Sequence, residues 1–147
     1  MQRVTRAAVS VGGTVVSSIG PGLCLLVGVE TGDEERDLAV VVGKIAGLRI
    51  FGDDEGKMNR GIDEVGGEIL IVSQFTLLGD VRKGRRPSFT AAAPPARAGP
   101  LVDAMAAGFR AKGISTAQGV FGARMEVELV NDGPVTLLVD VRSGRVG

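Results

Sequence analysis

An unbroken apolar run, Leu23 to Val29, most constrains how this 147-residue chain can fold. A strand with one face in water alternates apolar and polar residues, whereas a run without polar residues predicts a strand that is buried on both faces. The turn residues Gly20-Pro21-Gly22 precede the run, and a helical pattern follows it. The sequence therefore predicts a sheet whose central strand is covered on both sides.

Further strands are expected wherever short apolar runs lie between turn residues. The expected strands are Arg3 to Val9, Thr14 to Ile19, Leu23 to Val29, a short one at Leu48 to Phe51, Glu68 to Phe75, Met125 to Val130 and Val135 to Val141. Gly12-Gly13 predicts a tight hairpin turn, and Asn131 to Pro134 predicts a second hairpin connection between the last two strands.

Two helices are expected between these strands. The first starts at a cap on Thr31 or Asp33, and its apolar face is formed by Leu38, Val41, Val42, Ile45 and Leu48. The second is entered through prolines 94, 95 and 100 and ends at Gly113. This mixed order indicates an α/β or α+β protein, and we favour α/β: one compact domain, residues 1–147, of mixed sheets packed with two main helices. Residues 142–147 are expected to form a frayed tail.

The chain contains no histidine and a single cysteine, Cys24. Ser-His-Asp and Cys-His catalytic units and the usual zinc sites are therefore excluded. The acidic triplet Asp53-Asp54-Glu55 could hold Mg²⁺, but a solvated turn before Gly56 is the favoured interpretation. We expect neither a metal nor a cofactor. No apolar run approaches the ~20 residues of a membrane span, and no secretory signal is seen, so a cytoplasmic protein is expected.

Three segments carry residue types that scaffolding does not require. Polar side chains end an apolar strand at Ser73, Gln74 and Thr76, which indicates either a pocket or an ordinary strand terminus. In Asn131 to Thr136, the Gly133-Pro134 bond is expected to be trans on frequency alone, because only about 5–6% of X-Pro bonds are cis. The third segment concentrates positive charge in a chain of zero net charge; its cations are Arg82, Lys83, Arg85 and Arg86. Such a loop indicates contact with phosphates or a role in solubility.

Together these segments resemble the D-aminoacyl-tRNA deacylase family. The resemblance lies in Gln2-Arg3-Val4, Lys44 to Phe51, Gly56 to Asn59, Ser73 to Leu77, Arg82 to Phe89 and Asn131 to Thr136. The two signature motifs, Ser-Gln-Phe-Thr and Asn-x-Gly-Pro-Val-Thr, are both intact. The chain departs from many relatives in starting directly before Gln2, so that either the first strand is shortened or the true start codon lies upstream. It also carries Leu78 in place of Tyr.

The resemblance implies a homodimer with active sites at the interface, and substrates that are D-aminoacyl-tRNA and mischarged glycyl-tRNA. Ser73, Gln74, Phe75 and Thr76 would line the pocket for the terminal adenosine and the ester. A cis Gly133-Pro134 corner, with Asn131, Val135 and Thr136 beside it, would enter the partner's site and hold the substrate's α-amino group. Arg3 would brace that corner.

A hydroxyl without a neighbouring base is a poor nucleophile, so we expect catalysis by position and by main-chain N–H groups near Phe75 and Thr76 rather than by a covalent threonine. Water would attack, assisted by the ribose 2′-hydroxyl. With the amino group and ester both fixed, an L side chain would strike the corner, whereas a D side chain would point to solvent. Rival interpretations are a deacylase of relaxed chirality, a non-catalytic nucleic-acid-binding dimer, and a small-molecule esterase.

Overall fold

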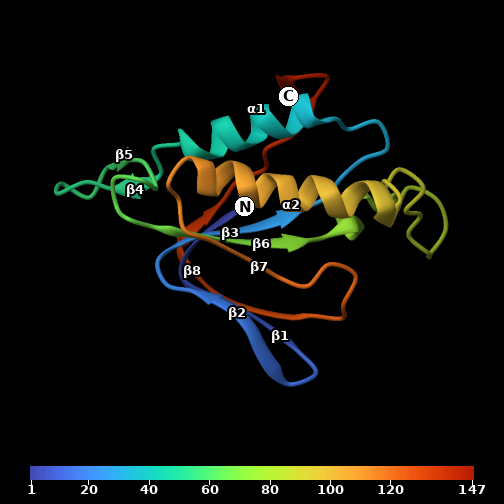
Figure 1. Ribbon diagram of the computed structural model, residues 1–147, viewed down its shortest axis with the longest axis horizontal. Coiled ribbons are helices and arrows are strands. Elements are labelled where there is room, and N and C mark those ends of the chain that lie inside the picture. Colours follow the sequence, from blue (N-terminus) through green and yellow to red (C-terminus); the bar gives the residue numbers. More distant parts are fainter.

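The computed structural model describes all residues, 1–147, as a curled main sheet with two helices across one face and two small two-stranded sheets (Figure 1). The strands are β1 (Gln2–Val11), β2 (Thr14–Ile19), β3 (Gly22–Val27), β4 (Phe51–Gly52), β5 (Met58–Arg60), β6 (Glu68–Ser73), β7 (Thr116–Gln118), β8 (Glu126–Thr136), β9 (Val141–Arg142) and β10 (Arg145–Val146). The helices are α1 (Glu35–Ala46), the 3₁₀ turn η1 (Phe75–Leu78) and α2 (Pro95–Ala111). No helix is both long and apolar enough to cross a membrane.

The main sheet has the order β2-β1-β3-β6-β7, and β8 pairs with β1. The β3–β6 and β6–β7 pairs are parallel, whereas β1 pairs antiparallel with β2, β3 and β8. A mixed sheet with two main helices was predicted, and this architecture is confirmed. β2 also contacts β6 and β7, so the sheet curls toward a barrel.

The central strand is buried on both faces, as its apolar run predicts. Leu23 and Leu25 of β3 point into the core beneath α1 and α2, together with Phe109 of α2. Cys24 lies on the opposite face of the same strand, in a second core inside the curl of the sheet. That cysteine is 1% exposed, and burial raises the pKa of its thiol.

Several predicted boundaries are wrong for local reasons. Helix α1 is capped by Glu34 rather than by Thr31 or Asp33, because Asp37 reaches back to accept the N–H of Glu34 at 2.9 Å. The strand predicted to run to Phe75 ends at Ser73, where η1 begins to form. The short strand predicted at Leu48 to Phe51 is instead β4, and it pairs with β5, which was not predicted.

The connection at Asn131 to Pro134 is not a hairpin. β8 continues along β1 through this segment: Asn131 pairs with Val4 and Thr136 with Gln2, so five residue steps on β8 match two on β1. The surplus residues bulge out of the strand, as local insertions in a ladder do. We call residues 132–135 the corner.

The ends of the chain are more ordered than the sequence suggests. The amino group of Met1 donates to the oxygen of Leu137 at 2.8 Å, and β1 runs from Gln2 to Val11, so Arg3 lies within a paired strand. The tail predicted to fray folds into the β9–β10 hairpin over α1. Its Gly144 N–H donates to the buried carboxylate of Asp37 at 2.6 Å.

Candidate functional site

The corner is held by two side chains that lie behind it. Arg3 of β1 donates from Nε to the oxygen of Asp132 at 2.9 Å and from Nη1 to the oxygen of Ile50 at 2.6 Å. The Arg3 side chain is only 14% exposed, and its bond to Ile50 is partly buried, whereas its bond to Asp132 lies at the surface. Asn131 spans the neck of the corner, because its Oδ1 accepts the N–H of Val135 at 2.8 Å and its Nδ2 donates to the oxygen of Val135 at 3.2 Å.

The corner itself is exposed at Gly133 and Pro134. The peptide bond between them is cis, the state implied by the family resemblance and not the trans state that frequency alone favours. Gly133 has a φ of 143°, and a Cβ there would lie 2.7 Å from Cγ2 of Val135. Only glycine fits this position.

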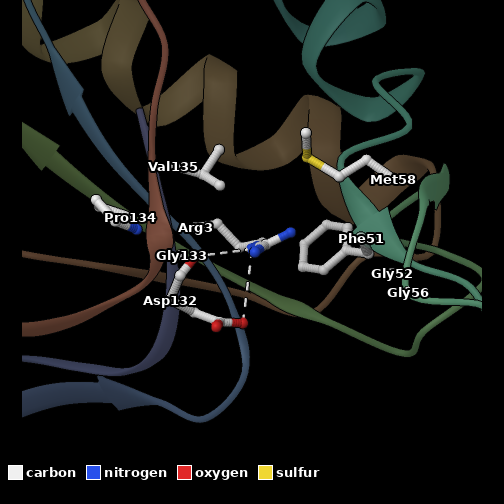
Figure 2. Close-up of a pocket in the computed structure, with 9 residues that line it drawn as sticks. All are labelled: Arg3, Phe51, Gly52, Gly56, Met58, Asp132, Gly133, Pro134 and Val135. Carbon is white, nitrogen blue, oxygen red and sulfur yellow. Dashed lines mark hydrogen bonds and ion pairs between the residues drawn. The ribbon is translucent and has the colours of Figure 1, made fainter.

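A cleft of about 420 Å³ opens beside the corner (Figure 2). The β4–β5 hairpin forms its other wall, and Phe51 and Met58 face Arg3 across it. Gly52 and Gly56 complete that wall. The acidic triplet of this hairpin forms a turn, as favoured by its sequence: Oδ1 of Asp53 accepts the N–H groups of Glu55 and Lys57, each at 2.9 Å.

The other signature motif lies at the carboxyl end of β6. Gln74 extends the parallel ladder by donating its N–H to the oxygen of Val27 at 2.7 Å, and η1 starts at the next residue. Phe75 and Thr76 are exposed at the start of this turn. The side-chain amide of Gln74 donates to the hydroxyl of Thr76. No histidine, lysine or carboxylate is bonded to that hydroxyl.

The start of η1 presents main-chain donors. The first bond of the turn runs from the N–H of Leu77 to the oxygen of Gln74 at 3.2 Å. The N–H groups of Phe75 and Thr76 precede that bond, so the turn supplies no acceptor for either. Two adjacent donors at an exposed strand end are suited to an oxygen that gains negative charge.

Ser73, the last residue of β6, lines a small crevice. Gln118, Gly119 and Phe121 line this crevice together with Asp103 of α2. Nε2 of Gln118 donates to Asp103 at 3.0 Å, and the Phe121 ring is 42% exposed. Sequence reasoning missed these residues, because the short strand β7 that carries Gln118 gives almost no periodic signal.

The basic loop begins just after η1 ends. Asp80 and Ser88 close its base by exchanging main-chain bonds of 2.7 and 2.9 Å, and Phe89 packs edge-on against Phe75 with ring centroids 5.1 Å apart. Lys83, Arg85 and Arg86 are exposed between these closures and form no ion pair. Arg82 differs, because it donates from Nε and Nη2 to the carboxylate of Asp80, which holds the pKa of Asp80 below its usual range.

The two signature motifs do not meet within one chain. β8, β1, β3 and β6 are successive strands. The pairs Thr136–Gln2, Gln2–Cys24 and Cys24–Leu70 place Thr136, the residue after the corner, level with Leu70 and before Ser73. Strand spacings of ~4.8 Å and rises of ~3.3 Å then separate Thr136 from Ser73 by roughly 17 Å along the sheet. None of residues 73–76 lines the cleft at the corner.

Fold and site together define a small α/β protein in which main-chain groups of two separate segments are exposed where a substrate can reach them. The D-Tyr-tRNA(Tyr) deacylase family model matches residues 1–140. The chain belongs to this family, whose members hydrolyse the ester bond of aminoacyl-tRNA. The predicted family and the predicted enzyme class, aminoacyl-tRNA deacylase, are confirmed.

Individual relatives agree with the family assignment. The D-aminoacyl-tRNA deacylase of Heliobacterium modesticaldum is 58% identical over 144 residues, which cover 98% of this chain and 96% of that protein. The D-aminoacyl-tRNA deacylase of Desulfitobacterium hafniense is 61% identical over 140 residues, which cover 95% of this chain and 94% of that protein. The solved structure of a c-Myc DNA Unwinding Element Binding Protein superposes with a TM-score of 0.85 at 42% identity, covering 92% and 93% of the two chains. A probable eukaryotic D-amino acid tRNA deacylase shares the fold at a TM-score of 0.76 and 20% identity, and the match covers 90% of this chain and 92% of that one.

Proposed function

We propose that this protein removes D-amino acids from tRNA as a homodimer, releasing free D-amino acid and tRNA, and that it also clears glycine mischarged on tRNA(Ala). The observation that carries the proposal is the corner: exposed main-chain atoms of Gly133 and Pro134, fixed from behind by Arg3 and Asn131. Such a corner can hold an α-amino group through its oxygens and reject one hand of the substrate by shape. It contacts no side chain of the amino acid, which is consistent with many D-residues being accepted.

Selectivity for D-aminoacyl esters would arise from a steric clash between the L side chain and the corner. When the amino group and the ester carbonyl are both held, the α-hydrogen and the side chain can exchange places only by inverting the carbon. An L side chain then meets the corner, whereas a D side chain points to solvent. Glycine has no side chain to collide, which predicts cleavage of glycyl-tRNA. Discrimination of this kind rests on a clash with the wrong substrate and not on a contact with the right one.

The dimer is supported by the separation of the two motifs. Thr136, the residue after the corner, lies roughly 17 Å from Ser73 along the sheet, so the corner cannot act on an ester held at Phe75 of the same chain. A second copy can supply the corner. β8, which carries it, has a free edge, since β8 pairs only with β1. Apolar side chains are exposed along that strand and just beyond it: Val127, Val130, Leu137 and Leu138. An exposed apolar edge strand is suited to burial against another chain.

The ester would be held at the start of η1. The N–H groups of Phe75 and Thr76 would bind the carbonyl oxygen as it becomes an oxyanion, a contribution of about 3–4 kcal/mol for a well-placed donor. The hydroxyl of Thr76 is bonded to a neutral amide, which is no base, so it is not activated as a nucleophile. Water would attack the carbonyl carbon, and the ribose 2′-hydroxyl would assist. The bond between the carbonyl carbon and the ribose 3′-oxygen then breaks, and that oxygen takes up the proton given up by the attacking water and leaves as the 3′-hydroxyl of tRNA.

The RNA would be held on both sides of the ester. Phe121, which is exposed beside the small crevice at Ser73, offers a ring on which the base of the terminal adenosine could stack. Lys83, Arg85 and Arg86 would contact phosphates of the acceptor end, because a basic loop on an otherwise neutral chain adds affinity through charge. Arg82 would mainly hold the loop closed through Asp80. Because charged tRNA is made in the cytoplasm, the protein would act there.

A matched set of charged tRNAs tests the proposal. D-tyrosyl-tRNA and glycyl-tRNA(Ala) should be deacylated, and L-tyrosyl-tRNA should survive, at enzyme concentrations where the dimer is seen by light scattering. Equal cleavage of the D and L forms would instead indicate the deacylase of relaxed chirality. Salt-sensitive binding to RNA or DNA without ester cleavage would favour a nucleic-acid-binding protein, which is how the 42% identical relative of known structure is named. Equally fast cleavage of free D-tyrosine ethyl ester would indicate a small-molecule esterase.

A further inference from the structure

Gly28 lies where the end of β3 meets the first turn of η1. Its neighbour Val27 is the last residue of β3 and accepts the N–H of Gln74, so the chain before η1 is fixed at this level. A Cβ added to Gly28 would lie 2.5 Å from Cδ2 of Leu78, 3.2 Å from Cβ of Leu77 and 3.3 Å from the oxygen of Gln74. All three atoms belong to η1 or to the residue that starts it.

A side chain at position 28 is excluded by lack of space and not by the backbone conformation of Gly28. Gly28 is not among the glycines with positive φ, so an L-residue could adopt its backbone angles. A Cβ atom essentially never lies within 3.0 Å of another heavy atom that is not bonded nearby. A contact near 3.3 Å requires the neighbouring atom to move by a few tenths of an ångström. Leu78 could rotate away, but Cβ of Leu77 and the oxygen of Gln74 move only with the turn. The absence of a side chain at position 28 is what lets η1 settle against the sheet.

The opposite side of the turn is equally close. A Cβ on Gly79 would lie 3.0 Å from Cε1 of Phe89 and 3.0 Å from the oxygen of Thr76. Phe89 in turn packs against the ring of Phe75. The turn is thus confined between a glycine at the sheet and a glycine at the aromatic pair. The two N–H groups that precede its first hydrogen bond belong to this confined turn.

We propose that Gly28 is a positioning residue for the deacylation reaction: by leaving room for η1 it sets the direction of the Phe75 and Thr76 N–H groups. The inference rests on the proposed oxyanion role of those groups. Main-chain donors cannot be adjusted by rotating a side chain, so their aim depends wholly on where the turn lies. Misplacement by a fraction of an ångström to 1 Å is expected to lower kcat by roughly ten- to a hundredfold.

The test compares kcat and KM of Gly28→Ala with those of the wild type on D-tyrosyl-tRNA. We expect kcat to fall at least about tenfold with KM within about twofold, because the RNA-binding groups lie outside the turn. The double variant Gly28→Ala with Leu78→Ala removes the nearest clash and should regain part of the lost kcat. Gly43→Ala is the matched control, since nothing lies within 4 Å of a Cβ there and Gly43 is on α1, away from the site.

Gly79→Ala would displace the same turn by a separate steric contact, and it should give the same fall in kcat at nearly constant KM. If Gly28→Ala does not fold, as judged by circular dichroism, the outcome for Gly79→Ala decides. Wild-type kcat in the folded variants would overturn the inference and leave the proposed function intact. A wild-type enzyme that does not cleave D-tyrosyl-tRNA would overturn the proposed function itself.

Discussion

The Nε atom of Arg3 lies 2.9 Å from the main-chain oxygen of Asp132, although 129 positions separate the two residues in the sequence. The same guanidinium reaches the oxygen of Ile50 from Nη1. One side chain therefore ties the corner on β8 to the segment that enters the β4–β5 hairpin. Planar, multi-donor geometry is what allows arginine to serve both oxygens, and lysine lacks it.

Arg3→Lys is expected to weaken both the corner and the fold. A single ammonium cannot span the two oxygens, so a hydrogen bond to a charged group is lost, which costs about 1.5–3 kcal/mol. We expect kcat/KM for D-tyrosyl-tRNA to fall at least about tenfold and the free energy of urea unfolding to drop by that amount. Arg6→Lys is the control, because Arg6 is on the same strand but is 62% exposed in its pair with Glu128. Equal losses in the two variants would contradict a specific role for Arg3.

Gly133→Ala is expected to abolish most of the activity. Its Cβ would lie 2.7 Å from Cγ2 and 2.8 Å from the N atom of Val135, so the corner must change shape. Gly144→Ala separates this clash from the cost of positive φ, since Gly144 has a φ of 74° with open space around it. The control should lose about 1 kcal/mol of stability and keep its kcat. Steady-state kinetics of both variants, with thermal melts, measure the difference.

Thr76→Val is expected to retain substantial hydrolysis, within about tenfold of wild-type kcat, because the main-chain N–H survives the substitution. Thr76→Ala should behave alike. Single-turnover measurements on D-tyrosyl-tRNA report the chemical step directly. A drop to the uncatalysed rate in both variants would mean that the threonine is a nucleophile after all.

Alanine substitutions in the basic loop should act on RNA affinity. Removing Lys83, Arg85 or Arg86 is expected to raise KM and to lower the slope of log K against log salt by about 0.7–0.9 for each phosphate that is no longer neutralised. Arg82→Ala should differ, since Arg82 is occupied by Asp80 and its removal loosens the loop as a whole. Lys44→Ala, an exposed change on α1, serves as the control. Salt titrations with unchanged slopes for all three variants would exclude the loop from RNA binding.

The C-terminal hairpin should make stability depend on pH through Asp37. The N–H groups of Gly144 and Glu34 donate to its carboxylate and lower its pKa in the folded state. A lowered folded pKa contributes stability that is present above the unfolded pKa of about 3.9 and is lost as the pH falls through the folded value. Asp37→Asn should therefore be less stable than wild type at pH 7, with the gap closing toward pH 3. Urea unfolding at both pH values measures this, and a gap of constant size would contradict it.

Sequence reasoning succeeded where one physical signal dominates. The doubly buried β3 is indicated by its apolar run, and the polar end of β6 by residues that a core would not accept. Sequence reasoning failed at the corner, because Asn-Asp-Gly-Pro is the signature of a turn. No neighbouring residue indicates that the strand resumes its pairing with β1 after these four residues. The pairing of Met1 with Leu137 and the hydrogen bond of Gly144 to Asp37 were missed for the same reason, since both are long-range contacts.

The seclusion of Cys24 has a practical consequence. With that thiol 1% exposed and its pKa raised, a cysteine introduced on the surface becomes the sole target for maleimide reagents under native conditions. A spectroscopic label at position 138, whose leucine is 92% exposed, or at position 83 in the basic loop would then mark a single known point on each copy. In the proposed homodimer, distances between the two labels would give the arrangement of the subunits in solution.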